Sequence, residues 1–500
     1  MYNKINDNFY ILIYKLGKGA CGEVWFAIEF KNFMFNLKKC KIDISTKALK
    51  IHFEDDYDEG ILETKIKDLL PKDDSFSKYI NYPISDFIYD DNKVVVVYDV
   101  AIGSLYDILK MYDNKFPTDF INKIINQMSN SIQFLHKNDL IHTDIKPENF
   151  LLMGITKYQH DIFEFVKNYN LYSKFKFTNK KNLTFEKIEK IIKNPIKEML
   201  YELNLKYDIK KNSSSTENSD LFDTDEDDEQ TNSEQTNSEQ EENDLNEDNF
   251  KVENKSIHNE KSDSKNYISN ISSKADTDLL SYDSDKKEYD NIYDKFNIKK
   301  ISLLKEMSNT LLYETTDSED EIDNQNKDEY KNFIKKYIDE PKILLTDFGL
   351  LRKKNSTSRT LQTRYYRSPE IILGLKYDEK IDLWALGCTL YELITGEILI
   401  DIKKSEYYEI YDMDLINIKL LIEYFEDKDY INIKKMALNS PRKDYIFNNN
   451  LTLKFFKNIK YNNWKNNISL VNYDKKIIDF IDNLLKPNIG DRFLTSFNPN

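Results

Sequence analysis

Eight residues in the first third of the chain decide its fold: His-Thr-Asp-Ile-Lys-Pro-Glu-Asn, at 142–149. Asp144 is placed to accept or orient the proton of an attacking hydroxyl group. Lys146 is placed to neutralise charge on a transferring phosphoryl group, and Asn149 to hold a metal ion. The stretch therefore predicts phosphoryl-transfer chemistry, although a motif this short also occurs by chance.

A second acidic motif, Asp347-Phe348-Gly349, lies far downstream. Asp347 would supply a carboxylate to the Mg²⁺ ion that bridges the phosphates of ATP. This triplet alone also occurs by chance. Its order along the chain, after a glycine loop, a strand lysine and the 142–149 stretch, argues against coincidence.

Upstream, a glycine cluster separates two short apolar runs, 9–16 and 24–28, that we predict to be strands. A hairpin that closes over ATP needs glycine where its backbone approaches the phosphate oxygens. A dinucleotide-binding loop would need a helix after the glycines, and here another strand follows. The predicted ATP-binding loop comprises Leu16, Gly17, Lys18, Gly19, Ala20, Cys21, Gly22, Glu23 and Val24.

The next strand should carry a lysine that reaches the phosphates, and we predict this strand at 33–42. It offers Lys38 and Lys39, which point to opposite faces. Lys38 is preferred because it leaves the smaller neighbouring side chain on the adenine side, and Lys39 remains the alternative. Glu63, in a helix predicted over 61–70, is the candidate for an ion pair with this lysine. Its alternative reading is an ordinary surface glutamate.

Together these motifs resemble those of eukaryotic protein kinases, over 9–155 and 340–495. The stretch at 362–370, Gln-Thr-Arg-Tyr-Tyr-Arg-Ser-Pro-Glu, resembles the end of an activation segment, and Arg492 is placed to pair with Glu370. Asp-Leu-Trp-Ala-Leu-Gly, which begins at Asp382, resembles the helix that anchors the catalytic loop.

The resemblance implies an α+β, bilobal protein kinase fold that uses ATP and Mg²⁺. Its N-lobe is a small, mostly antiparallel β-sheet with one helix, and its C-lobe is larger and α-helical. Arg367 is typical of the group that holds cyclin-dependent, MAP, Cdc2-like and SR-protein kinases. By similarity to that group, Tyr98 is the gatekeeper, and the backbones of Asp99 and Ala101 bind adenine.

Within that group the chain is most similar to SR-protein kinases. The catalytic loop, the place of a long acidic insertion, the short segment from Asp347 to Glu370, and the stretch 443–448 followed by Trp464 all agree. This similarity implies protein substrates of the Arg/Ser-rich class, docked near Glu423. The chain departs from those kinases at the expected docking groove, where Ile416 stands in place of an acidic residue and Lys419 adds a positive charge.

Two competing readings remain. A Cdc2-like or DYRK-like dual-specificity kinase would keep the chemistry and change the acceptor, although Lys146 favours transfer to serine or threonine. A catalytically dead pseudokinase scaffold would lack the strand lysine, the catalytic aspartate or the metal aspartate, and all three residue types are present.

The acidity of the chain belongs to one segment. Of the 87 acidic residues, 15 lie in 217–248, which has no lysine or arginine, and the remaining acidic residues equal the 72 basic ones. A short Gln-Thr-Asn-Ser-Glu repeat and few aromatic residues predict that 211–330 is disordered. Residues 158–205 carry apolar side chains at helical spacing and should pack on the folded body.

The resemblance divides the chain into an N-lobe at 9–100, a first C-lobe part with the catalytic loop at 101–155, an insertion at 156–340 and a second C-lobe part at 341–500. We predict further helices that begin at Thr118 and cover 380–395, 415–425 and 475–485.

Three separated cysteines argue against a disulfide framework or a zinc site. Because no apolar run approaches a membrane span or a signal peptide, we expect an intracellular protein, cytoplasmic or nuclear, or in the host cell or virion if viral. We expect a monomer without direct contact to nucleic acid or membrane.

Activation is the last expectation. Many kinases pair a phosphorylated activation loop with an arginine before the catalytic aspartate, but that position here is Thr143. By resemblance, Thr363 hydrogen-bonds Asp144 and Lys146 directly and so completes the catalytic group. The sequence therefore predicts constitutive activity.

Overall fold

The structure is a computed structural model that describes residues 8–19, 21–31, 43–89, 93–112, 114–169, 194–203, 301–302, 324–354, 361–408, 410–425, 427–456, 459, 461–469 and 473–498. All of them fall in one compact unit, formed by the residues on either side of 214–277. No described helix is long and apolar enough to cross a membrane.

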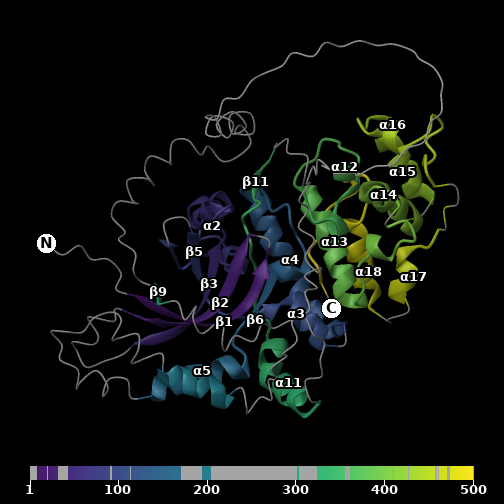
Figure 1. Cartoon of the computed structure of the whole chain (residues 1–500). Helices are drawn as coiled ribbons and strands as arrows, with labels where there is room; N and C mark the ends of the chain where they lie inside the picture. The colour runs from purple at the N-terminus through teal and green to yellow at the C-terminus, as the bar shows by residue number, and fades with distance from the viewer. Residues whose placement is uncertain are drawn as a thin grey trace, which may run out of the picture. The chain divides into compact units, whose positions relative to one another are not determined.

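The N-terminal part is a twisted sheet with the strand order β4-β5-β3-β2-β1-β9 (Figure 1). Neighbouring strands are antiparallel, except that β9 runs parallel to β1. The strands are β1 (Phe9–Gly19), β2 (Gly22–Phe30), β3 (Ile44–His52), β4 (Ser85–Tyr89), β5 (Lys93–Tyr98) and β9 (Ile301–Ser302).

The third strand differs from the prediction. The third described strand is β3, at Ile44–His52. The predicted strand at 33–42 lies entirely outside the described residues. The large apolar residues Phe33, Met34 and Phe35 made 33–42 the stronger strand signal, although it carries three lysines and β3 only two. The sheet tolerates Lys47 and Lys50 because each pairs with a carboxylate, at 2.7 Å in both cases.

Helix α2 (Tyr57–Leu69) covers one face of this sheet, near the predicted 61–70. Ile61 packs there with Val94 and Val96 of β5. A Cβ atom at Gly60 would lie 2.8 Å from the Val94 Cβ and 2.9 Å from the His52 Cγ. Glycine at this position is therefore what lets α2 approach β3 and β5 so closely.

The same face of the sheet, over β1 and β2, is also covered by residues that follow the catalytic loop. It is the same face because Phe26 pairs directly with Ala48 of the α2 side. Ile162 and Val166 of α5 (Lys157–Asn168) and Met199 of a helix at 194–203 join a buried cluster with Ile11 and Phe26. The prediction that 158–205 packs on the folded body is confirmed for these described helices.

Two described elements fall within the segment 211–330, for which disorder was predicted. One is β9, and the other is α11 (Asn324–Asp339), which begins before residue 330. The prediction is wrong for these residues. Ile334 of α11 is fully buried in the main core, so packing of its second half orders a helix whose first turns are polar.

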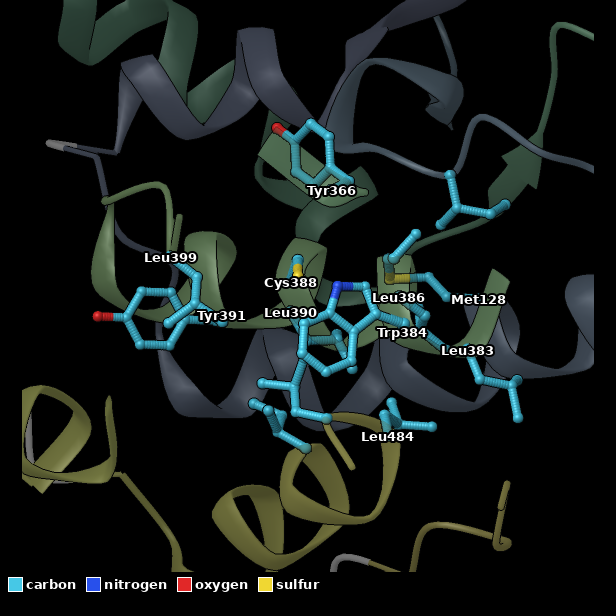
Figure 2. Close-up of a cluster of buried hydrophobic side chains, with 14 of the residues drawn as sticks. Met128, Tyr366, Leu383, Trp384, Leu386, Cys388, Leu390, Tyr391, Leu399 and Leu484 are labelled. Carbon is cyan, nitrogen blue, oxygen red and sulfur yellow. The ribbon is translucent and has the colours of Figure 1, made fainter. Parts of the chain in front are cut away.

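The C-terminal part is helical, with α13 at its centre (Figure 1). Nearly every residue of α13 is buried, and Trp384, Leu386 and Leu390 contribute to the core between α4 and α18 (Figure 2). The predicted helices are confirmed here as α4 (Thr118–Lys137), α13 (Lys380–Thr395), α14 (Met413–Tyr424) and α18 (Lys475–Leu484). The C-terminal part also contains helices that were not predicted: α3 (Leu105–Met111), α12 (Pro369–Ile372), α15 (Asp427–Leu438), α16 (Lys443–Ile446) and α17 (Trp464–Ser469).

Two small sheets join these parts and carry the loops of interest. One has the order β10-β8-β6 and the other pairs β11 with β7. Their strands are β6 (Ala101–Ser104), β7 (Leu140–Ile141), β8 (Phe150–Met153), β10 (Ile343–Leu345) and β11 (Arg352–Lys353). The loops after β7 and β10 are thereby brought side by side.

Candidate active site

The antiparallel pairing of β8 with β10 brings the two acidic motifs together. The Thr346 backbone N–H donates to the Asn149 carbonyl at 3.0 Å, and the His142 Nε2 lies 3.0 Å from the Thr346 carbonyl. His142 is completely buried. Asp347, the next residue after Thr346, is therefore held at a fixed place beside the 142–149 loop.

Helix α13 anchors this loop through Asp382, as the sequence predicts. The buried Asp382 accepts hydrogen bonds from the backbone N–H groups of His142 at 2.8 Å and Thr143 at 2.9 Å. Its carboxylate also lies 2.9 Å from the His136 Nε2. Thr143 has a φ of 71°, in the left-handed region that non-glycine residues rarely adopt. Asp382 compensates this local strain by satisfying both amides.

The catalytic candidates Asp144 and Lys146 are joined by the activation segment. Lys146 Nζ lies 2.8 Å from Asp144 Oδ2, and the Thr363 hydroxyl donates to Asp144 Oδ1 at 2.7 Å. Lys146 Nζ also donates to the Thr363 oxygen at 3.3 Å. The contacts predicted for Thr363 are thus present, and the three residues form one hydrogen-bonded group.

Asn149 is tied to the same group. Its amide nitrogen donates to the Asp144 carbonyl at 2.7 Å and to the Asp144 Oδ2 at 3.3 Å. Because the nitrogen is used in this way, the amide oxygen is the atom that Asn149 can offer to a cation.

The strand lysine is Lys50, not Lys38. Lys50 Nζ lies 2.7 Å from Glu63 Oε2 and 2.8 Å from Asp347 Oδ1, so it joins α2 to the loop after β10. Lys38 and Lys39 lie outside the described residues. The lysine that the structure pairs with Glu63 is thus Lys50, in place of the predicted Lys38. The signal that could have found Lys50 is the sequence Ala-Leu-Lys at 48–50, which matches the Ala-Ile-Lys pattern expected on this strand.

These contacts shift the pKa values of the charged groups. Burial alone would lower the pKa of Lys50, but Asp347 and Glu63 outweigh it and raise that pKa. Burial would raise the pKa of Asp347, but Lys50 more than offsets it and the pKa falls. Burial would likewise lower the pKa of Lys146, but the nearby Asp144 carboxylate outweighs it and raises that pKa to about 12. All three groups are therefore ionised at neutral pH.

The glycine loop is the hairpin between β1 and β2, with Gly17 opposite Val24, Lys18 opposite Glu23 and Gly19 opposite Gly22. A Cβ at Gly22 would meet the Ile51 carbonyl oxygen at 2.4 Å, so this glycine is required by the approach to β3. A Cβ at Gly17 would meet nothing within 4 Å, which leaves open space on that side of the hairpin. Ala20 lies outside the described residues.

A small apolar cluster lies between the glycine loop and the sheet. Leu16 and Val24 pack against buried Ala48 and Tyr98. Asp99 follows Tyr98 directly, and its carboxylate pairs with Lys47 at 2.7 Å while 67% of its side chain is exposed. Ala101 begins β6 two residues later. The residues predicted to bind adenine thus stand next to the loop predicted to bind phosphate.

The end of the activation segment is fastened by a buried ion pair, as predicted. Two guanidinium nitrogens of Arg492 lie 2.5 and 2.6 Å from the two carboxylate oxygens of Glu370, and both side chains are at most 1% exposed. Arg367 donates to the Gln362 carbonyl and pairs with Asp414 at 3.1 Å. The Glu370–Arg492 and Arg367–Asp414 pairs hold the segment against the helical part.

The predicted docking residue Glu423 is committed to an internal contact. Its carboxylate lies 2.7 Å from the Lys419 Nζ, and the two side chains are only 11% and 8% exposed. Lys419 also lies over the rings of Tyr407 and Phe456. The lysine that intrudes in the sequence therefore neutralises the glutamate, and Ile416 beside it is fully buried.

A Mg²⁺ ion fits the oxygen atoms of this site. Among the described residues no cluster of three or more His, Cys, Asp or Glu side chains could hold a metal by itself. Mg²⁺ is commonly bound by one or two protein oxygens together with substrate phosphates. Asp347, with 43% of its side chain exposed, and Asn149 match that pattern of a partial site that ATP completes.

Comparison with known proteins indicates the family to which the chain belongs. The protein kinase domain family matches residues 10–175 and 330–496. A protein of Acanthamoeba polyphaga mimivirus, named as a serine/threonine-protein kinase, is 26% identical over 435 residues, which cover 78% of this chain and 68% of the relative.

Two shorter sequence matches are to proteins that are also named as protein kinases. An SRPK serine/threonine-protein kinase of Physarum polycephalum is 40% identical over 90 residues, 17% of this chain and 21% of the relative. A dual specificity protein kinase of Schizosaccharomyces pombe is 42% identical over 71 residues, 14% of this chain and 10% of the relative. A crystal structure of a kinase domain has a TM-score of 0.48 at 16% identity, over 97% of this chain and 92% of that chain.

The family match covers most of the chain in two segments, on either side of the insertion. Its two parts contain Lys50, Asp144 and Asp347, which the fold brings together. The chain belongs to the protein kinase domain family, and it is a serine/threonine-type protein kinase with a divided catalytic domain.

Proposed function

We propose that this kinase transfers the γ-phosphoryl group of ATP to serine and threonine residues of proteins, with Asp144, Lys146, Thr363, Asn149, Asp347 and Lys50 as its site residues. The observation that supports this proposal is the ion-pair chain from Glu63 through Lys50 to Asp347, at 2.7 and 2.8 Å. It joins the sheet to the loop after β10, so the groups that bind ATP and metal are preorganised.

Each residue has a role that its contacts allow. Asp144 accepts or orients the proton of the acceptor hydroxyl group, because its carboxylate is held in place by Lys146 and Thr363. Lys146 neutralises charge that develops on the phosphoryl group. Lys146 contacts both the Asp144 carboxylate and the Thr363 hydroxyl, so an acceptor hydroxyl group that reaches Asp144 would also lie near Lys146.

On the nucleotide side, Lys50 contacts the ATP phosphates and the glycine hairpin covers them. The Asp99 and Ala101 backbones bind adenine against the Leu16 and Val24 side chains. Asp347 and Asn149 would hold Mg²⁺, which would neutralise phosphate charge.

For the acceptor class, we propose serine and threonine without a docking contribution from Glu423. Arg/Ser-rich substrates remain the predicted class through the similarity to SR-protein kinases, but Glu423 is neutralised by Lys419 at 2.7 Å. Selection of such substrates would therefore rest on residues nearer Asp144. The alternative is dual specificity, with autophosphorylation on tyrosine.

The test is phosphorylation of an arrayed peptide library with γ-labelled ATP, followed by phosphoamino-acid analysis of both the peptides and the kinase. Asp144→Asn is the matched control, since it keeps the size of the side chain and removes its charge. We expect phosphoserine and phosphothreonine with the wild type and none with the variant. Phosphotyrosine on the kinase would support dual specificity, and equal labelling by Asp144→Asn would refute the assigned chemistry.

A further inference from the structure

Glu63 is held by more than the strand lysine. Its side chain is 1% exposed, and its two oxygens face three different side chains. Oε2 lies 2.7 Å from Lys50 Nζ and 3.0 Å from His52 Nε2. Oε1 accepts a hydrogen bond from the Tyr98 hydroxyl at 2.5 Å. The carboxylate thus meets β3 twice and the end of β5 once.

His52 is an unusual residue in this position. It lies two residues after Lys50 on β3, so both side chains point to the same face of the strand. Its side chain is 0% exposed, and neither ring nitrogen has a hydrogen-bond partner of good geometry among the described residues; Nε2 meets Glu63 Oε2 as an ion-pair contact at 3.0 Å. A buried polar atom without a partner costs stability. The chain therefore tolerates a cost at His52 that an aliphatic residue would avoid.

The surroundings of His52 are built to admit it. The bare backbone of Gly60 leaves room for the imidazole, because a Cβ there would lie 2.9 Å from the ring. The charged groups that interact with the ring are Glu63 and Glu59 on α2 and Asp56 just before α2, and Lys50 lies two residues before it on β3. Its closest polar contact is Glu63.

The three groups around Glu63 differ in what else they must do. Lys50 is divided between Glu63 and Asp347 and, under the function proposed above, must also contact ATP. The His52 imidazole and the Tyr98 hydroxyl have no such second contact among the described residues, although the Tyr98 ring also packs with Leu16 and Val24. They can keep Glu63, and with it α2, in place while Lys50 turns toward the phosphates.

We propose that His52 is a positioning residue for the ATP site, which together with Tyr98 anchors Glu63 independently of Lys50. This inference rests on the proposed function, because it requires Lys50 and Glu63 to serve ATP. His52 touches no reacting atom and acts only through Glu63. A purely structural histidine, packed into the notch at Gly60, would act on stability instead.

The experiment measures kcat and KM for ATP, with the melting temperature of each protein, for His52→Leu, His52→Gln, Glu63→Gln and the double variant His52→Leu/Glu63→Gln. His52→Leu removes the polar contact and keeps an apolar filler. His52→Gln retains an N–H donor. His160→Leu is the control, because His160 lies on α5 with 43% of its side chain exposed.

We expect His52→Leu to lower kcat/KM for ATP about fivefold, the factor that loss of one buried hydrogen-bond-scale contact produces. His52→Gln should restore most of it, and His160→Leu should match the wild type. In the Glu63→Gln background, His52→Leu should have almost no further effect. Wild-type kinetics in His52→Leu, or the same loss with and without Glu63, would overturn the proposal.

If His52→Leu does not fold, Tyr98→Phe is measured in the same two backgrounds, with the same expectation that its effect vanishes in Glu63→Gln. Asp347→Asn separates the two levels of inference. An active Asp347→Asn enzyme would refute the proposed function itself. An inactive one, with His52 or Tyr98 effects that persist in Glu63→Gln, would refute only the anchoring role.

Discussion

Replacement of Arg492 by methionine should lower the free energy of unfolding more than replacement of a surface residue does. The guanidinium makes a two-pronged pair with Glu370 at 2.5 and 2.6 Å, with both side chains at most 1% exposed. It also donates to the carbonyls of Lys486 at 2.6 Å and Pro487 at 3.0 Å. Methionine fills a similar volume but leaves the Glu370 carboxylate buried without a cation.

Breaking one side of a buried ion pair costs roughly 3–5 kcal/mol of unfolding free energy. For a domain of this size, each kcal/mol lowers the melting temperature by about 2–4 °C. We therefore expect Arg492→Met to melt on the order of 10 °C below the wild type. The double variant Glu370→Gln/Arg492→Met should recover part of the loss, because no buried charge remains.

The assay is urea denaturation at 25 °C followed by fluorescence, with a thermal melt alongside. Lys486→Met is the control, because its pair with Asp482 is 27% and 26% exposed and should be worth at most about 1 kcal/mol. If Arg492→Met is destabilised no more than Lys486→Met, the buried pair does not anchor the activation segment as argued.

Three further predictions concern regulation, the insertion and pH. Kinase made in bacteria and treated with phosphatase should keep its activity within about twofold, because Thr363 already bonds Asp144 at 2.7 Å and Thr143 cannot pair with phosphate; a loss of about tenfold, equal to roughly 1.4 kcal/mol of barrier, would contradict this. Deleting 214–277, which lies outside the catalytic unit, should leave the kinase folded and active by thermal melt and peptide assay, since loop length affects stability only logarithmically; an intact fold without activity would reveal a catalytic role. Burial raises the pKa of Glu392 from 4.5 to about 7, so the folded state holds this proton more tightly and stability falls as pH rises from 4.5 to 7. Glu392→Gln should flatten that fall by up to about 3 kcal/mol in urea titrations across this range, and an unchanged pH profile would refute the assigned shift.

The catalytic motifs could be read from the sequence because each one is local. The residues at 142–149 and 347–349 carry their spacing with them, whatever the chain between them does. The Glu370–Arg492 pair could be predicted because the family resemblance aligned two distant segments, and Asp382 for the same reason. These residues needed no knowledge of packing.

Lys50 was missed because strand patterns favour apolar runs. The stretch 33–42 is more apolar than β3, whose lysines become acceptable only when Asp99 and Glu63 fold against them. The anchoring residues His52 and Tyr98 were not linked to Glu63 for a similar reason. Their contact depends on the approach of α2 at Gly60, which is a property of the tertiary structure.

The start of α11 was misjudged because its first turns are polar. Composition alone assigns 324–330 to the disordered insertion, whereas Ile334 is fully buried and extends the ordered helix toward its N-terminus. Local propensity and burial pointed in different directions, and burial decided the outcome.

The identity of the strand lysine is the point at which sequence and structure disagree, and it offers the most direct test of the account. Transfer of the labelled γ-phosphoryl group from ATP to protein should be measured for Lys50→Met and Lys38→Met side by side with the wild type. We expect Lys50→Met to be folded and to lose nearly all transfer, and Lys38→Met to keep it. An active Lys50→Met enzyme, or an inactive Lys38→Met enzyme with a normal melting temperature, would contradict the site built around Lys50, Glu63 and Asp347.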